Sequence, residues 1–199
     1  MVLMKNGGQA ELLAQFTDHK SVLELTVQRH APTVDDIVAQ VSACFRAGSR
    51  LFFCGNGGSA ADAQHFAAEF VNRLHMDRRA LPALALTTDT SVLTCIANDA
   101  DYSQVFSRQI EAFGSQGDIL VALSTSGGSA NVLAALATAQ AAKLTTVGFT
   151  GEGGAERMGD KCDVLVAAAS EDCARIQECH EFLWHFIADQ VEKEFLAAT

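Results

Sequence analysis

The sequence predicts an α/β fold in which a doubly wound, five-stranded parallel sheet lies between helices. Short apolar runs of the length of buried strands alternate with stretches of helical periodicity. Two loops rich in glycine and serine each follow such a run and precede a helical stretch. The predicted strands are 51–54, 84–86, 119–123, 145–149 and 164–166, and the clearest helices after the first strand are 60–74, 103–113, 130–141 and 174–195. This alternation is typical of parallel sheets with crossover helices.

Helical periodicity also precedes the first strand. It predicts one helix from residue 9 to about residue 30 and a second over 33–47, separated at Pro32. We expect a single domain over 1–199, in which residues 9–48 form these helices and residues 49–199 form the sheet and the last helix. The outer helices carry more apolar residues than one sheet face needs, so they predict either a contact between copies or a cap on the sheet edge of a monomer.

Composition restricts the partners. The net charge of −10 and the scatter of only 14 Lys and Arg residues disfavour a nucleic-acid partner. No apolar run approaches the roughly 18 residues that indicate a membrane span, and the first residues turn polar too early for a signal peptide, so we expect a cytoplasmic protein with no membrane partner. The 6 cysteines form no C-x-x-C pair, which predicts buried thiols and neither disulfides nor a structural zinc site.

The two loops, 55–59 and 124–129, predict a binding site for a phosphorylated small molecule. Each loop ends a strand and opens a helix, so unpaired backbone N–H groups and a helix dipole face the ligand. Serine hydroxyls add donors, and the expected phosphate contacts are Ser59, Ser124, Ser126 and Ser129. The alternative is that these serines only cap helices. A dinucleotide site is disfavoured, because no acidic residue ends the next strand at the required distance.

Two helical stretches carry polar side chains at a spacing that places them on one face of each helix. His65 and Glu69 are four residues apart and share one helix face. In the last helix Gln177, Glu181 and His185 share a face, with His180 further round. Imidazole, carboxylate and amide groups suit either a first-row metal site or proton transfer, and a polar seam between packed helices is equally compatible with the spacing. From spacing, His180 stays open as a participant.

The segments 54–70, 96–99, 124–127 and 175–178 closely resemble the phosphoheptose isomerases, which belong to the sugar isomerase (SIS) domain family. The resemblance runs from about residue 10 to the end of the chain. It implies a flavodoxin-like sheet and a homotetramer with active sites at subunit contacts. It also implies conversion of sedoheptulose 7-phosphate to D-glycero-D-manno-heptose 7-phosphate, the first step of bacterial heptose synthesis for lipopolysaccharide.

The same resemblance implies roles for individual residues. Sugar contacts are Asn56, Gly57, Gly58, Asn98 and Asp99, and phosphate contacts are Ser124, Thr125, Ser126 and Ser129, with Ser59, Glu69, Arg73 and Gln177 also in the substrate site. His65, Glu69, Gln177 and His185 match the zinc ligands, one zinc per subunit. Glu69 is the expected base and His185 the expected acid. Asp62 is expected to orient His65, and Arg73 to reach the sugar or a neighbouring subunit.

Two other functions remain at this stage. One is a non-catalytic SIS scaffold that binds a replication initiator protein, since a fold does not determine a function. Glu69 disfavours it, because a scaffold needs no carboxylate at the base position. The other is isomerisation of a different sugar phosphate, which is expected to change the residues around Asn98 and Asp99.

Overall fold

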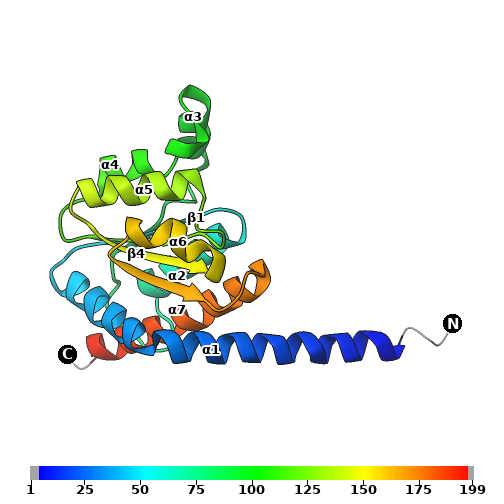
Figure 1. Cartoon of the computed structure of the whole chain (residues 1–199). Coiled ribbons are helices and arrows are strands. Elements are labelled where there is room, and N and C mark those ends of the chain that lie inside the picture. Colours follow the sequence, from blue (N-terminus) through cyan, green and yellow to red (C-terminus); the bar gives the residue numbers. More distant parts are fainter. Residues whose placement is uncertain (1–4, 197–199) are drawn as a thin grey trace.

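The computed structural model describes residues 5–196 and contains one five-stranded sheet (Figure 1). Its strands are β1 (Leu51–Gly55), β2 (Ala83–Ala85), β3 (Ile119–Leu123), β4 (Thr145–Gly151) and β5 (Val164–Ala168). They lie in the order β2-β1-β3-β4-β5, and all neighbours are parallel. The predicted fold class is confirmed, and four of the predicted strands begin at the residue where the sequence placed them.

Helices cover both faces of the sheet. The α-helices are α1 (Lys5–Arg46), α2 (Gly58–Val71), α3 (Thr90–Asp99), α4 (Ser107–Phe113), α5 (Ala130–Ala141), α6 (Ala155–Met158) and α7 (Cys173–Leu196), and single 3-10 turns occupy Tyr102–Gln104, Glu152–Gly154 and Gly159–Lys161. Helices α1, α2 and α7 pack on one face, and α4 and α5 pack on the other (Figure 1). The molecule therefore has three layers.

The central strands are buried on both faces, which explains why they are continuous apolar runs. In β1, Leu51 and Phe53 face α1, α2 and α7, whereas Phe52 and Cys54 face α4 and α5. Successive side chains of a strand point to opposite faces, so a strand covered twice needs no polar positions.

The prediction of two N-terminal helices was wrong, because α1 is one helix of 42 residues with Pro32 inside it. Proline removes one backbone hydrogen bond and usually ends a helix. Here the Pro32 ring is exposed, and the turns that follow it bury Val34, Ile37 and Val41 against the sheet. Tertiary packing on both sides of the proline keeps the helix continuous.

Two further differences lie between β2 and β3. Helix α3 was not predicted; it buries no residue, and its first turns carry Thr90, Ser91 and Thr94, which have low helix propensity. The predicted helix 103–113 is divided into the 3-10 turn Tyr102–Gln104 and α4.

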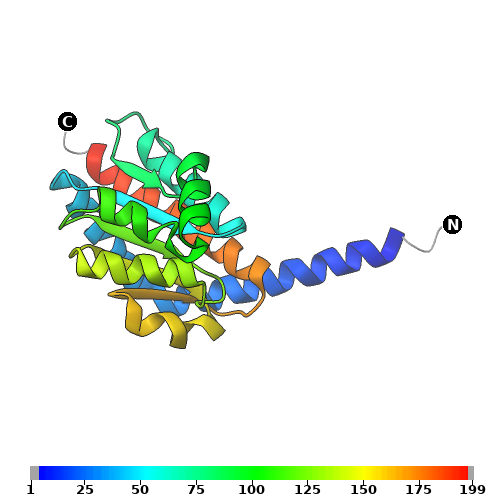
Figure 2. The same ribbon diagram turned by 90° about the horizontal axis from the view of Figure 1, so that it is seen from above.

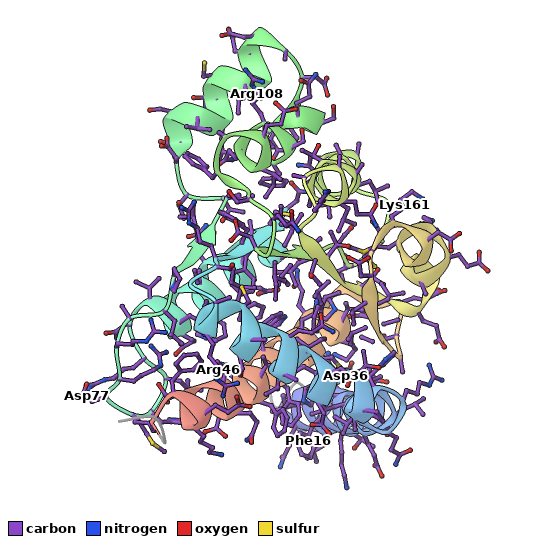
Figure 3. The ribbon with its side chains drawn as sticks, turned by 90° about the vertical axis from the view of Figure 1, so that its left-hand side faces the viewer. Phe16, Asp36, Arg46, Asp77, Arg108 and Lys161 are labelled. Carbon is purple, nitrogen blue, oxygen red and sulfur yellow. The ribbon has the colours of Figure 1, made fainter. Side chains whose placement is uncertain are left out.

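The N-terminal half of α1 extends away from the rest of the molecule (Figure 2). It carries Leu12, Leu13 and Phe16, which are 68%, 58% and 61% exposed. Figure 3 places Phe16 on the underside of the molecule, remote from α4 and its Arg108. This half of the helix presents apolar surface that no other part of residues 5–196 covers.

All 6 cysteines are free. The prediction of buried thiols is confirmed for Cys44, Cys54 and Cys179 and is wrong for Cys95 and Cys173, which are exposed. Within the described residues, no helix is both long enough and apolar enough to cross a membrane.

Replacing Pro32 with alanine tests the account of α1. Alanine restores the N–H that donates to the residue 28 carbonyl, so the free energy of unfolding is expected to rise by about 1–3 kcal/mol. Urea denaturation at fixed protein concentration measures it. Gln28→Ala, at an exposed position on the same helix, is the control. A loss of stability in Pro32→Ala would contradict the account, because it would mean that the proline stabilises α1 instead of being tolerated by the packing around it.

Candidate active site

The two Gly/Ser loops lie side by side. They follow β1 and β3, which are adjacent strands with Gly55 in register with Leu123. The Asn56 and Asn131 side-chain amides join them, each donating to the other's oxygen over 2.8 Å. Both loops therefore lie at the carboxyl edge of the sheet where the strand order reverses, the usual ligand-binding position of such sheets.

Glycines in both loops are required by geometry. Gly127 has a φ of +65°, and a Cβ there would lie 2.3 Å from the Gly154 carbonyl oxygen. A Cβ on Gly58 would lie 2.2 Å from Nε2 of Gln177. The second contact shows that the start of α7 rests against the first loop, so Gln177 belongs to this edge.

The serine hydroxyls of the second loop lie close together. Ser124 Oγ and Ser129 Oγ are 3.0 Å apart, and Ser126 Oγ accepts from the Gly128 N–H over 3.3 Å. Ser59 is the second residue of α2 and is 2% exposed. Helices α2 and α5 both start at this edge, so their unpaired N–H groups and positive dipole ends add to the hydroxyl donors. The arrangement suits a phosphate group.

The histidine and glutamate predicted on α2 meet the histidine of α7. His65 Nε2 is 2.9 Å from His185 Nε2 and 3.5 Å from Glu69 Oε1. One ligand atom from each of the three residues lies within 4.8 Å of the other two. Glu69 is the least exposed, at 17% of its side chain. Two imidazoles and a carboxylate that converge in this way could hold a metal ion.

The structure distinguishes His185 from His180. His180 is fully buried, its Nε2 lies 3.2 Å from the Thr150 carbonyl oxygen, and its ring packs edge-on against Phe149. Burial lowers the pKa of His180 to about 4. A neutral ring that packs against the sheet is a core group, so His180 does not belong to the cluster.

A carboxylate absent from the inferred set lies beside the cluster. Glu181 Oε2 is 3.8 Å from His65 Nε2 and 3.9 Å from His185 Nδ1. Its other neighbour is Asp62, whose pKa rises to about 7 because of burial and the Glu181 charge. Asp62 thus interacts with Glu181. The helical spacing of Glu181 with His185 was the available signal, and the resemblance did not include it.

Three predicted substrate contacts lie outside this cluster. Asn98 and Asp99 end α3, and their hydrogen bonds are local: Asn98 donates to Asp99 over 2.8 Å, and Cys95 donates to Asp99 over 3.4 Å. Arg73 follows α2 and pairs with Asp77. Tyr102, which no sequence signal indicated, connects the region of α3 to the first loop by donating to Asn56 over 3.2 Å.

Two glycine- and serine-rich loops at helix N-termini and a His/Glu cluster lie at one edge of a doubly wound sheet, an arrangement that suits a small phosphorylated ligand. The chain belongs to the SIS domain family, whose profile matches residues 15–151, and within it to the phosphoheptose isomerases. The phosphoheptose isomerase of Desulfovibrio desulfuricans is 52% identical over 176 residues, which are 88% of this chain and 83% of that protein. That of Clostridium acetobutylicum is 44% identical over 96% of each chain.

A solved structure agrees with these sequence relatives. The phosphoheptose isomerase of Neisseria gonorrhoeae superposes with a TM-score of 0.85 at 37% identity, over 93% of this chain and 98% of that chain. The three-layer architecture is therefore that of the family.

Exchanging each of two adjacent glycines for alanine tests the shape of the second loop. Gly127→Ala is expected to lower the free energy of unfolding by about 1–3 kcal/mol, because of its positive φ and the contact with Gly154. Gly128→Ala is the matched control: the nearest atom to its Cβ, Arg157 Cδ, is 3.5 Å away, so stability is expected to change by less than about 0.5 kcal/mol. Equal effects in urea denaturation would contradict the loop geometry.

Proposed function

We propose that this protein is an aldose–ketose isomerase that converts sedoheptulose 7-phosphate to D-glycero-D-manno-heptose 7-phosphate, the first step of bacterial heptose synthesis for lipopolysaccharide. The observation that carries the proposal is the convergence of His65, Glu69 and His185 beside two Ser/Gly loops. The names of the relatives supply the substrate. A scaffold that only binds another protein needs no such cluster.

The two loops hold the phosphate in this proposal. Ser59, Ser124, Thr125, Ser126 and Ser129 contact it, and Asn56, Gly57 and Gly58 line the path of the sugar chain. The protein is acidic overall, so backbone N–H groups and hydroxyls at two helix N-termini offset the phosphate charge. Asn98, Asp99 and Arg73 are proposed to contact the sugar hydroxyls.

Side chains on α2 and α7 carry out the proton transfer in this proposal. Interconversion of an aldose and a ketose needs a base that removes a proton from the carbon beside the carbonyl and an acid that serves the oxygen. Glu69 is the base, because it is the carboxylate of the cluster and only 17% of its side chain is exposed. His185, whose ring reaches the same point from α7, serves the oxygens of the resulting cis-enediol. Gln177 holds the substrate against the first loop.

His65, Glu69, Gln177 and His185 are proposed to hold one zinc ion per subunit. When bound, zinc would supply a Lewis acid for the substrate carbonyl. A carboxylate that binds a metal is a weaker base. The roles of Glu69 as base and as metal ligand therefore compete for the same oxygen atoms. Glu181 adds negative charge 3.8 Å from His65 Nε2, which favours a cation at this point.

A homotetramer with active sites at subunit contacts is proposed from the exposed apolar surface. A groove of about 390 Å³ beside α1 is lined by Leu12, Gln15, Phe16, His19, Arg175 and Glu178. On α7, Phe182 and Phe186 are 47% and 40% exposed. Apolar surface of this extent is usually covered by a partner. Six free thiols favour the reducing cytoplasm as the location.

The base assignment is tested by Glu69→Gln. Turnover of sedoheptulose 7-phosphate is expected to fall about 10²- to 10⁴-fold, because general-base catalysis contributes about that factor. Binding of the substrate is expected to persist in calorimetry, since the loops are untouched. Glu111→Gln on α4, an exposed glutamate remote from the cluster, is the control. Full activity in Glu69→Gln would refute the assignment.

The metal assignment is tested by chelation. Protein treated with a chelator and dialysed is expected to lose turnover and to regain it with stoichiometric zinc. His65→Ala is expected to weaken zinc binding measured directly by calorimetry, whereas His180→Ala is expected to leave the affinity for zinc unchanged. Undiminished turnover in metal-free protein would mean that Glu69 and His185 act without a metal.

A further inference from the structure

A buried ion pair lies at the C-terminal end of α2, the end that carries Glu69. Arg78 and Glu192 have side chains that are 2% and 1% exposed, and Arg78 Nε lies 3.4 Å from Glu192 Oε1. Figure 3 shows the neighbouring Asp77 on the loop that passes beside the C-terminal part of α7. Burying two charges costs free energy that their attraction does not always repay, so such a pair often serves specificity of structure.

Arg78 fastens the last turn of α2. Its Nη2 donates to the carbonyl oxygen of Glu69 itself over 2.6 Å, and its Nη1 donates to that of Phe70 over 2.8 Å. The last carbonyls of a helix have no partner within the helix, and this turn frays most readily. One guanidinium therefore holds the backbone of the residue proposed as the base.

Glu192 fastens the loop that follows. Its two carboxylate oxygens accept three successive backbone N–H groups, from Leu74, His75 and Met76, over 3.1, 2.8 and 3.0 Å. Because Glu192 belongs to α7, the ion pair ties the end of α2 to the helix that carries His185. The two halves of the cluster are thus joined at a second point, away from the substrate.

We propose that Arg78, paired with Glu192, is a positioning residue of the active site, which sets the place of the Glu69 carboxylate relative to His185. The proposal rests on the proposed isomerase activity. Arg78 touches neither substrate loop and acts through the backbone of Glu69. Displacement of a catalytic group by about 1 Å can reduce the rate about 100-fold, so a loosened last turn affects catalysis before it affects binding.

Arg78→Lys in the full-length chain tests the proposal. Lysine keeps the positive charge but presents one ammonium group in place of a planar fork, so it cannot hold the Glu69 and Phe70 carbonyls and Glu192 together. We expect kcat for sedoheptulose 7-phosphate to fall about 10- to 100-fold, with KM changed by less than about twofold.

Arg79→Lys is the matched control. Arg79 is the next residue; its side chain donates to the Phe45 carbonyl over 3.4 Å and lies over the Phe195 ring, and it bonds neither the Glu69 nor the Phe70 carbonyl. Its kcat is expected to stay near that of the unchanged protein. Leu136→Ala, which opens the core on the opposite sheet face, controls for lost stability. Retained kcat in Arg78→Lys, or an equal loss in Leu136→Ala at a matched melting temperature, overturns the proposal.

Amide hydrogen exchange provides a readout that does not depend on the substrate. Arg78→Lys is expected to speed exchange of the Asn72 amide, which donates to the Ala68 carbonyl, and of its neighbours at the end of α2, while α5 stays protected. If the unchanged protein fails to turn over sedoheptulose 7-phosphate, the proposed function fails and exchange decides the structural claim. Uniform acceleration over both helices, or none, overturns it.

Discussion

The packing of α7 against α2 through Trp184 is the interaction on which the site depends. Trp184 is 1% exposed, and its ring lies 5.1 Å from Phe53, 5.6 Å from Phe66 and 5.3 Å from Phe149, between ring centroids. These contacts hold one side of α7 against the sheet. His180, four residues earlier, lies on the same side and is buried with it. His185 is one residue further round the helix and meets His65, so the rotation of α7 decides which histidine is core and which is functional.

That dependence explains what the sequence could predict about the site. The two residue pairs that make up the site were each predictable from their spacing. His65 lies four residues before Glu69, and Glu181 lies four residues before His185, so each pair shares one helix face. The contact between His65 and His185 was not predictable, because these residues are 120 positions apart and their contact depends on how the Trp184 ring packs against neighbouring phenylalanines. For the same reason, spacing did not show whether His180 or His185 belongs to the site. Whether Asn98, Asp99 and Arg73 touch a substrate remains a prediction.

The fold was predictable where burial was complete and less so where local rules compete with packing. Strands β1 and β3 are buried on both faces, so their apolar runs marked them clearly. At Pro32 the local sequence was misleading. Proline usually ends a helix, but the packing of Val34 and Ile37 keeps α1 continuous. Helix α3 has no fully buried residue, and its polar start at Thr90, Ser91 and Thr94 obscured a short apolar stripe, Leu93, Ile96 and Ala97, that packs partly buried against the core.

The exposed half of α1 is coupled to the site through the first turns of α7. His19 Nδ1 lies 2.7 Å from Glu178 Oε2, and Arg175 donates to the Gln15 carbonyl over 2.8 Å. Glu178 adjoins Gln177, whose amide rests against Gly58 of the first loop. An isolated helix that extends into water is marginally stable, so a partner that covers Leu12 and Phe16 would order α1 as well. Ordering α1 would fix the start of α7, and with it Gln177, so in the proposed oligomer assembly and substrate binding would act on the same turn of one helix.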